Sequence, residues 1–135
     1  MDYKIIDIEG VGESYASKLK ECGIDTVAKL LEVGCMPKGR EELSETTGIS
    51  KKLILKWVNH ADLFRIDGVG PQFAELLEAS GVDTVKELRH RNAGNLADKV
   101  TEVNEERHLC HRVPSEKELQ KMIDQAGEIE PLVRY

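Results

Sequence analysis

Two Gly-Val-Gly segments are the part of this chain whose residue types and spacing favour a defined chemistry. They are Gly10-Val11-Gly12 and Gly68-Val69-Gly70. Glycine has no Cβ, so the backbone can turn sharply there, and bare amides follow at the start of a helix. Unpaired N–H groups and the helix dipole favour an anion such as a phosphate oxygen, while the valine is suited to fill the core. Both segments are candidate phosphate sites, and the alternative is that glycine serves only the turn while the other copy covers the helix end.

Basic side chains near these segments could add ionic contacts to a phosphate. Lys51 and Lys52 follow Thr47-Gly48-Ile49-Ser50, a second glycine turn at a helix start. Arg89 and Arg91 follow the second Gly-Val-Gly segment. Such spacing is also common on a solvated helix face, so a plain surface role is the alternative for these four residues.

The candidate residues lie in an internal repeat, which indicates the structural elements that position them. Residues 8–30 align with residues 66–88 at a constant offset of 58, and 11 of these 23 positions are identical. A weaker continuation pairs residues 50–61 with residues 115–126 at an offset of 65. The second copy is therefore about seven residues longer, with the extra residues between Ala93 and Val113. This self-similarity predicts a duplicated unit.

Helix signals recur in both copies. Gly23 and Gly81 stand where the end of a helix favours a positive φ, and Thr26 and Thr84 follow as N-cap candidates. Pro71 suits the first position of a helix. Each copy is therefore predicted to make a tight corner between two short helices.

The later helices of each copy are also indicated by capping residues and apolar stripes. Ser50 precedes an apolar helical stripe that contains Trp57, which we expect in the core. Ser115 with Glu118 three residues on forms a capping box for the last helix. Alternating runs long enough for a strand are missing. The sequence predicts an all-α chain of two units, residues 1–62 and residues 63–135, each with four or five short helices.

Neither a metal site nor a catalytic centre is completed by the sequence. His108, Cys110 and His111 invite a metal, but their spacing fits no common zinc pattern. Ser-His-Asp, HExxH and Walker patterns are missing, and two repeats leave no room in 135 residues for a separate catalytic region. We expect a non-enzymatic protein without a metal or other cofactor.

Composition narrows the class of partner. Nineteen Lys and Arg against 25 Asp and Glu give a net charge of −6, so any contact with a polyanion must be local. Aromatic residues are 4% of the chain, too few for a base-stacking platform. The cysteines, Cys22, Cys35 and Cys110, form no pairing pattern and indicate reduced thiols. We expect a cytoplasmic protein without a signal region or membrane span.

The extended pattern around each Gly-Val-Gly segment resembles the helix-hairpin-helix motif of DNA-repair and recombination proteins. It begins with an apolar residue at Ile8 or Ile66 and ends with Leu19 or Leu77. The weaker glycine turn at Gly48, and Arg112–Lys117 without the glycine in the second copy, suggest that a second, degenerate hairpin closes each copy. The resemblance implies duplicated double helix-hairpin-helix units in a SAM-like bundle of short helices.

Across essentially the whole chain, the sequence also resembles a prokaryotic family catalogued as a domain of unknown function built on such hairpins. The segments that carry this resemblance are Ala61–Gly70, Gly81–Leu88, Arg91-Asn92, Asn95-Leu96 and Pro114–Lys117. It implies sequence-nonspecific binding to the DNA phosphate backbone, carried by Gly10, Val11 and Gly12 and by Gly68, Val69 and Gly70.

Two functions follow as expectations. In the first, the hairpins bind the DNA backbone, with Lys51, Lys52, Arg89 and Arg91 as ionic support. In the second, an acidic module keeps the hairpin fold and binds a protein partner, another copy of itself included. Hairpins that bind phosphate usually carry Lys or Arg after the second glycine, whereas this chain has Glu13-Ser14 in one copy and Pro71-Gln72 in the other. Net charge favours the protein partner, and the intact glycine pairs favour DNA.

Overall fold

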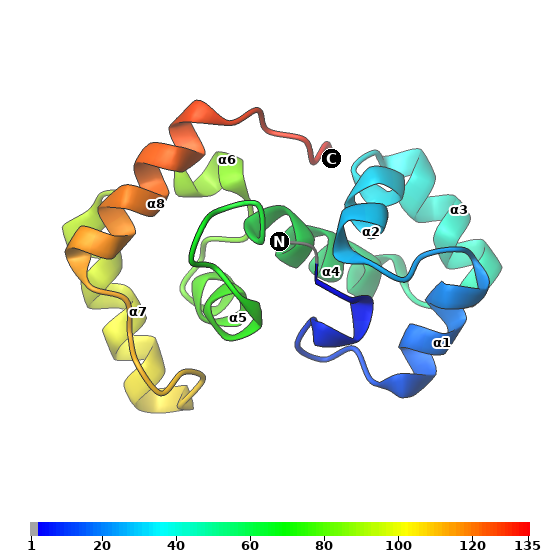
Figure 1. The fold of residues 1–135 in the computed structure, drawn as a ribbon, viewed down its shortest axis with the longest axis horizontal. Coiled ribbons are helices and arrows are strands. Elements are labelled where there is room, and N and C mark those ends of the chain that lie inside the picture. The colour runs from blue at the N-terminus through cyan, green and yellow to red at the C-terminus, as the bar shows by residue number, and fades with distance from the viewer. Residues whose placement is uncertain (1–2) are drawn as a thin grey trace. The chain divides into compact units, whose positions relative to one another are not determined.

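The computed structural model describes residues 3–135. The regular secondary structure of this part of the chain is helical, with loops between the helices and no strand, which confirms the predicted all-α class (Figure 1). It divides into two compact units, one formed by Met1–Asp62 with Leu132–Tyr135 and the other by Leu63–Pro131. Each unit is described by itself below.

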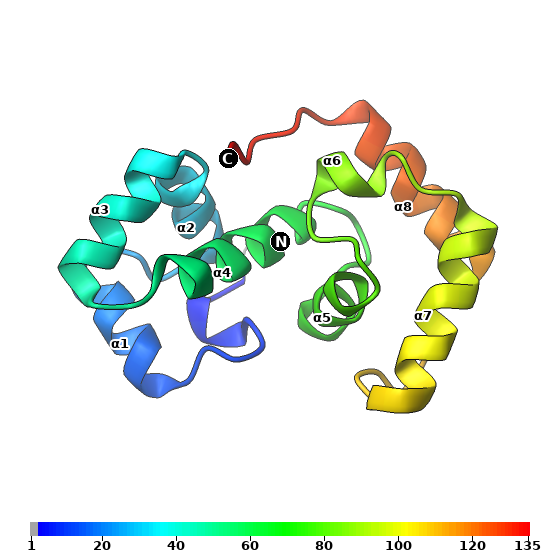
Figure 2. The same cartoon turned by 180° about the vertical axis from the view of Figure 1, so that it is seen from behind.

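The first unit begins with a short 3-10 helix and continues through four α-helices. In chain order these are η1 (Ile5–Asp7), α1 (Glu13–Glu21), α2 (Val27–Gly34), α3 (Pro37–Thr47) and α4 (Lys51–Leu63). Helices α2 and α3 lie side by side in both views (Figures 1 and 2). Trp57 of α4 is 1% exposed, and its ring centroid lies 5.1 Å from that of Tyr15 on α1. The predicted core position of Trp57 is thereby confirmed.

The second unit is built from four helices of very different length. They are α5 (Pro71–Ala79), α6 (Val85–Leu88), α7 (Ala93–Arg107) and α8 (Glu116–Glu128). The two long helices, α7 and α8, lie side by side, and α8 also contacts α6 while α7 contacts α5 (Figures 1 and 2). Apolar side chains of all four helices are buried, among them Leu77, Leu88, Val100 and Leu119.

The predicted helix signals work as expected. Gly23 and Gly81 have positive φ angles of 82° and 93°, so a side chain at either position would be strained. The hydroxyls of Thr26 and Thr84 accept the amide three residues further on, at 3.1 and 3.2 Å. Pro71 occupies the first turn of α5. These signals are local, which is why the sequence alone was enough to place them.

The last helix also starts as predicted. The Ser115 hydroxyl accepts the Glu118 amide, and the Glu118 carboxylate accepts the Ser115 amide, both at 3.1 Å. This reciprocal pair is the predicted capping box. At the start of α4, the Ser50 hydroxyl accepts the Leu53 amide at 3.2 Å.

The C-terminal residues Leu132–Tyr135 belong to the first unit, and we call them the C-terminal tail. The Arg134 amide donates to the Cys35 carbonyl at 2.7 Å, and Arg40 donates to the Arg134 carbonyl at 2.6 Å. Val133 is 6% exposed. The first and last parts of the sequence therefore share one folded unit.

Within residues 3–135, the structure has no helix of the length and apolar character needed to cross a membrane.

Candidate functional site

The two Gly-Val-Gly segments form turns with the same backbone geometry. Gly10 and Gly68 have φ angles of 89° and 85°, in the left-handed region that favours glycine. After each of them, the valine amide donates to the carbonyl three residues earlier, at 3.1 Å in both copies. Val11 and Val69 are 5% and 3% exposed. Each turn therefore anchors its valine in the core and leads directly into a helix.

The second glycine of each segment is the N-cap of the following helix. Gly12 caps α1 with φ −83°, and Gly70 caps α5 with φ −105°. Any residue can adopt these angles, and a Cβ built on Gly12 meets nothing within 4 Å. Glycine is therefore not required at Gly12 by backbone conformation or by packing.

Most other helices of the described chain have a side chain as N-cap. The caps of α2, α6, α7 and α8 accept an amide of the first turn through Thr26, Thr84, Asn92 and Ser115. Helices α1 and α5 have no such bond, because a glycine cap carries no side chain. The first-turn amides after the two turns are thus available to an outside acceptor.

Carboxylates surround the first turn. Glu9 and Glu13 are both exposed, and Glu13 occupies the first position of α1. Near the second turn, Asp67 is exposed and its amide donates to the Gln125 side chain at 2.9 Å. A carboxylate near a phosphate site lowers the affinity for phosphate by direct repulsion.

The predicted basic residues divide between the units. Lys51 and Lys52 are exposed in the first turn of α4, in the same unit as Gly10–Gly12. Arg89 and Arg91 lie just after α6, in the same unit as Gly68–Gly70. Each predicted turn therefore has two of the predicted cations in its own unit.

The two arginines already have partners within their unit. Arg91 forms an ion pair with Glu87 at 2.7 Å and also donates to the Gly81 carbonyl at 2.8 Å. Arg89 donates to the Gly127 carbonyl, near the end of α8, at 2.9 Å. A phosphate contact from either guanidinium would compete with these bonds, whereas Lys51 and Lys52 have no ion pair in the described part of the chain.

His108, Cys110 and His111 do not gather into a metal-binding group within residues 3–135. His108 ends α7 with a left-handed φ of 52°, and the Cys110 thiol lies 3.3 Å from the Gln72 carbonyl. Cys110 also exchanges two backbone bonds with the Asn104 side chain, at 2.8 and 2.9 Å. This segment acts as a hydrogen-bonded turn between α7 and α8.

Arg40 of α3 is the charged residue that sequence reasoning missed. Its side chain is buried, and its guanidinium donates to the Gly34 carbonyl at 2.7 Å and to the Arg134 carbonyl at 2.6 Å. Burial lowers the pKa of Arg40 from its ordinary value. The mostly polar sequence of α3 gives no signal that its arginine will be buried.

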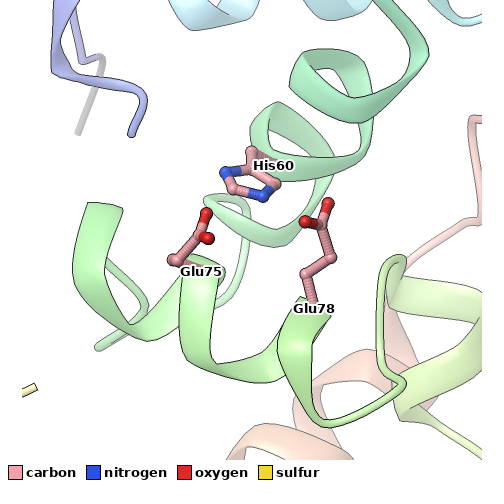
Figure 3. A group of neighbouring side chains, drawn as sticks. All are labelled: His60, Glu75 and Glu78. Carbon is pink, nitrogen blue, oxygen red and sulfur yellow. The ribbon is translucent and has the colours of Figure 1, made fainter. Parts of the chain in front are cut away.

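Two glutamates on α5 are further charged residues that sequence reasoning did not single out. Glu75 and Glu78 lie three residues apart and project from α5, as Figure 3 shows. Within the second unit, Glu75 lies 3.9 Å from Arg107 of α7. His60, also drawn in Figure 3, projects from α4 and belongs to the first unit.

Comparison with known proteins adds a family. No curated protein and no solved structure matches this chain. One family, described as a domain of unknown function (DUF4332), matches residues 9–129. That range contains both Gly-Val-Gly turns and all of the helices α1 to α8. It ends before the C-terminal tail. The chain therefore belongs to the DUF4332 family.

Proposed function

We propose that this protein binds the DNA phosphate backbone without sequence specificity, through two helix-hairpin-helix motifs. The contacts would be the first-turn amides that follow Gly10–Gly12 and Gly68–Gly70. Lys51 and Lys52 would add ionic support in the first unit, and Arg89 and Arg91 in the second. The protein would act as a binding module without catalysis.

One observation carries this proposal. Five other helices, α2, α4, α6, α7 and α8, have a Thr, Asn or Ser side chain as cap, and α3 begins after Met36 without such a bond. Both helices that follow a Gly-Val-Gly turn are capped by glycine. Gly12 meets no neighbour that would exclude a side chain. A bare cap keeps the amides open, and open amides at a helix N-terminus are the usual backbone device for holding a phosphate oxygen.

The matching geometry of the two turns supports the helix-hairpin-helix assignment. Equivalent glycines adopt the same positive φ, and equivalent valines donate the same bond at the same length. Two copies in one chain would contact two stretches of backbone. The Gly-Val-Gly residues themselves expose no side chain to a base edge, since the valine of each turn is buried, which fits a nonspecific mode.

The test is fluorescence anisotropy with duplex and branched DNA between about 50 and 200 mM salt. If the protein neutralises two to four phosphates, this rise in salt concentration should weaken binding roughly 10- to 100-fold. The variant Gly12→Glu with Gly70→Glu places a carboxylate at each cap and should abolish binding while the helix content by circular dichroism is retained.

The matched control is Thr101→Glu with Gln120→Glu. It adds the same two charges at exposed positions of α7 and α8, outside the two Gly-Val-Gly segments and the helices that follow them. The control should bind nearly as well as the natural protein. Equal loss in both variants would reduce the effect to overall charge and would overturn the role of the turns.

A protein partner is the second candidate function. It is favoured by the net charge of −6 and by the engagement of Arg89 and Arg91 in bonds of their own unit. If a protein is the partner, the anisotropy experiment should detect no DNA binding even at the lowest salt concentration. Sedimentation of the natural protein would then show whether the partner is a second copy of the chain.

A further inference from the structure

Two surface grooves of the first unit differ in the charge of their lining. The larger, about 540 Å³, lies beside α1, and its charged lining residues are Lys4, Lys20, Glu13 and Asp25. The smaller, about 380 Å³, lies between α3 and α4, and we call it the α3–α4 groove. Its lining residues are Pro37, Arg40, Glu41, Lys51, Lys52 and Leu55. Charges balance in the larger groove, whereas three cations face one carboxylate in the α3–α4 groove.

The cations of the α3–α4 groove are not neutralised by neighbouring carboxylates. Within the described residues, Arg40, Lys51 and Lys52 make no ion pair, and Glu41 makes none with them. Lys51 and Lys52 also occupy the first turn of α4, where the helix dipole adds positive potential. The groove therefore concentrates positive charge in an otherwise acidic protein.

Arg40 makes this groove a built feature of the fold. The residue is 7% exposed, and two backbone carbonyls fix its guanidinium, those of Gly34 and Arg134. These neutral acceptors use two of its five N–H donors. Tyr135 and Cys35 also act electrostatically on Arg40 and favour its charged form. Arg40 is therefore a held cation in the lining of the groove, and its charge adds to those of Lys51 and Lys52.

We propose that the α3–α4 groove binds a phosphate group, held by Lys51 and Lys52, with the buried Arg40 as the third cation of its lining. The ligand is a phosphate of the DNA backbone or the phosphate of a small phosphorylated compound. Both sources present the same tetrahedral oxyanion to the same three cations.

This inference deepens the proposed function, and it rests on that function only for the backbone source of the phosphate. The second unit provides an internal comparison. Glu116 and Lys117 begin α8 where Lys51 and Lys52 begin α4, so one of the two lysines is replaced by a carboxylate. The proposed site is thus specific to the first unit.

The experiment is a titration of the isotope-labelled full chain with inorganic phosphate at constant ionic strength, followed residue by residue by NMR. We expect saturable shifts of the amides of Arg40 and Lys51–Leu53, and no such shifts with chloride. Lys51→Gln with Lys52→Gln should weaken the phosphate affinity roughly tenfold or more. The matched control, Lys117→Gln with Lys121→Gln, removes two exposed lysines of α8 and should leave the affinity unchanged.

Linear, non-saturating shifts with phosphate, or equal shifts with chloride, would overturn the site. A second titration with duplex DNA separates the sources. Saturable phosphate binding without duplex binding would keep the site, assign it to a small phosphorylated compound and refute the proposed function. Duplex binding that ignores Lys51→Gln with Lys52→Gln, together with no saturable phosphate binding, would keep the proposed function and overturn this inference.

Discussion

At the scale of single residues, Glu118 combines a capping bond with an ion pair. Arg112 donates two bonds to its carboxylate, at 2.6 and 3.0 Å, and the Ser115 amide donates a third at 3.1 Å. The bonds from Arg112, followed by the Ser115 amide, lower the pKa of Glu118 to about 2. All three bonds favour the charged carboxylate, which is the physical cause of the shift.

We therefore predict a pH-dependent contribution of Glu118 to stability. Because its pKa is lower in the folded chain than the ordinary value of 4.5, the contribution is complete above pH 4.5 and is lost as the pH falls toward 2. A carboxyl NMR titration should place the pKa near 2 in the natural protein and higher in Arg112→Gln. In Lys121→Gln, which keeps Arg112, the pKa should stay low. An unchanged pKa in Arg112→Gln would refute the role of the ion pair.

Two helical glycines provide a second prediction at this scale. A Cβ on Gly39 of α3 would lie close to the Val33 carbonyl oxygen, whereas a Cβ on Gly127 of α8 meets nothing within 4 Å. Gly39→Ala should destabilise the protein by about 1–3 kcal/mol, because the backbone must move. Gly127→Ala should stabilise it by about 0.5–1 kcal/mol, because alanine loses less entropy in a helix. Urea unfolding followed by circular dichroism checks both signs.

At the scale of elements, local signals made most of the fold predictable. A positive φ at Gly23, a hydroxyl cap at Thr26 and the capping box at Ser115 each depend on a few neighbouring residues. Arg91 has a local signal of its own. Glu87 lies four residues before it, a spacing typical of an ion pair, and that pair forms. A phosphate contact from Arg91 stays a prediction, and it would have to compete with Glu87.

The two glycines of a Gly-Val-Gly turn should respond differently to substitution. Gly10 has φ +89°, so Gly10→Ala should cost about 1–2 kcal/mol of stability. Gly12 is a cap in extended conformation, so Gly12→Ser should change stability by a few tenths of a kcal/mol at most. Its hydroxyl would then accept a first-turn amide and weaken DNA binding. Urea unfolding and anisotropy measured on the same variants separate the two effects.

A Gly12→Ser protein that binds DNA as tightly as the natural protein would show that the amides of α1 are not phosphate contacts. The corresponding change at Thr26 is the control. Thr26→Ser keeps the hydroxyl cap of α2, so it should leave DNA binding unchanged.

At the scale of the whole molecule, the return of the C-terminal tail could not be predicted. Arg40 and Arg134 are 94 residues apart in sequence, and the bond between them uses a backbone carbonyl, which carries no residue-specific signal. Repeat analysis finds similar copies, and the tail has no counterpart in the first copy. Long-range bonds of this kind depend on the completed fold. The burial of Arg40 and the charge of the α3–α4 groove therefore could not be predicted from the sequence either.

The tail gives the last prediction, the variant Arg40→Met. It keeps a long apolar side chain but leaves the Gly34 and Arg134 carbonyls without their buried donor. A lost bond to a charged group costs about 1–3 kcal/mol. Unfolding of the first unit, followed by the fluorescence of Trp57, should therefore begin at lower urea. The Arg134 amide, which donates to the Cys35 carbonyl, should exchange faster with solvent.

The control for this variant is Arg89→Met, because Arg89 also donates to a backbone carbonyl, that of Gly127, but in an exposed setting and in the second unit. It should leave both the Trp57 transition and the exchange of the Arg134 amide unchanged. If Arg40→Met leaves the exchange of Arg134 unchanged as well, Val133 and Tyr135 hold the tail without the arginine. Faster exchange confined to Arg40→Met would establish that this one buried cation fixes the tail.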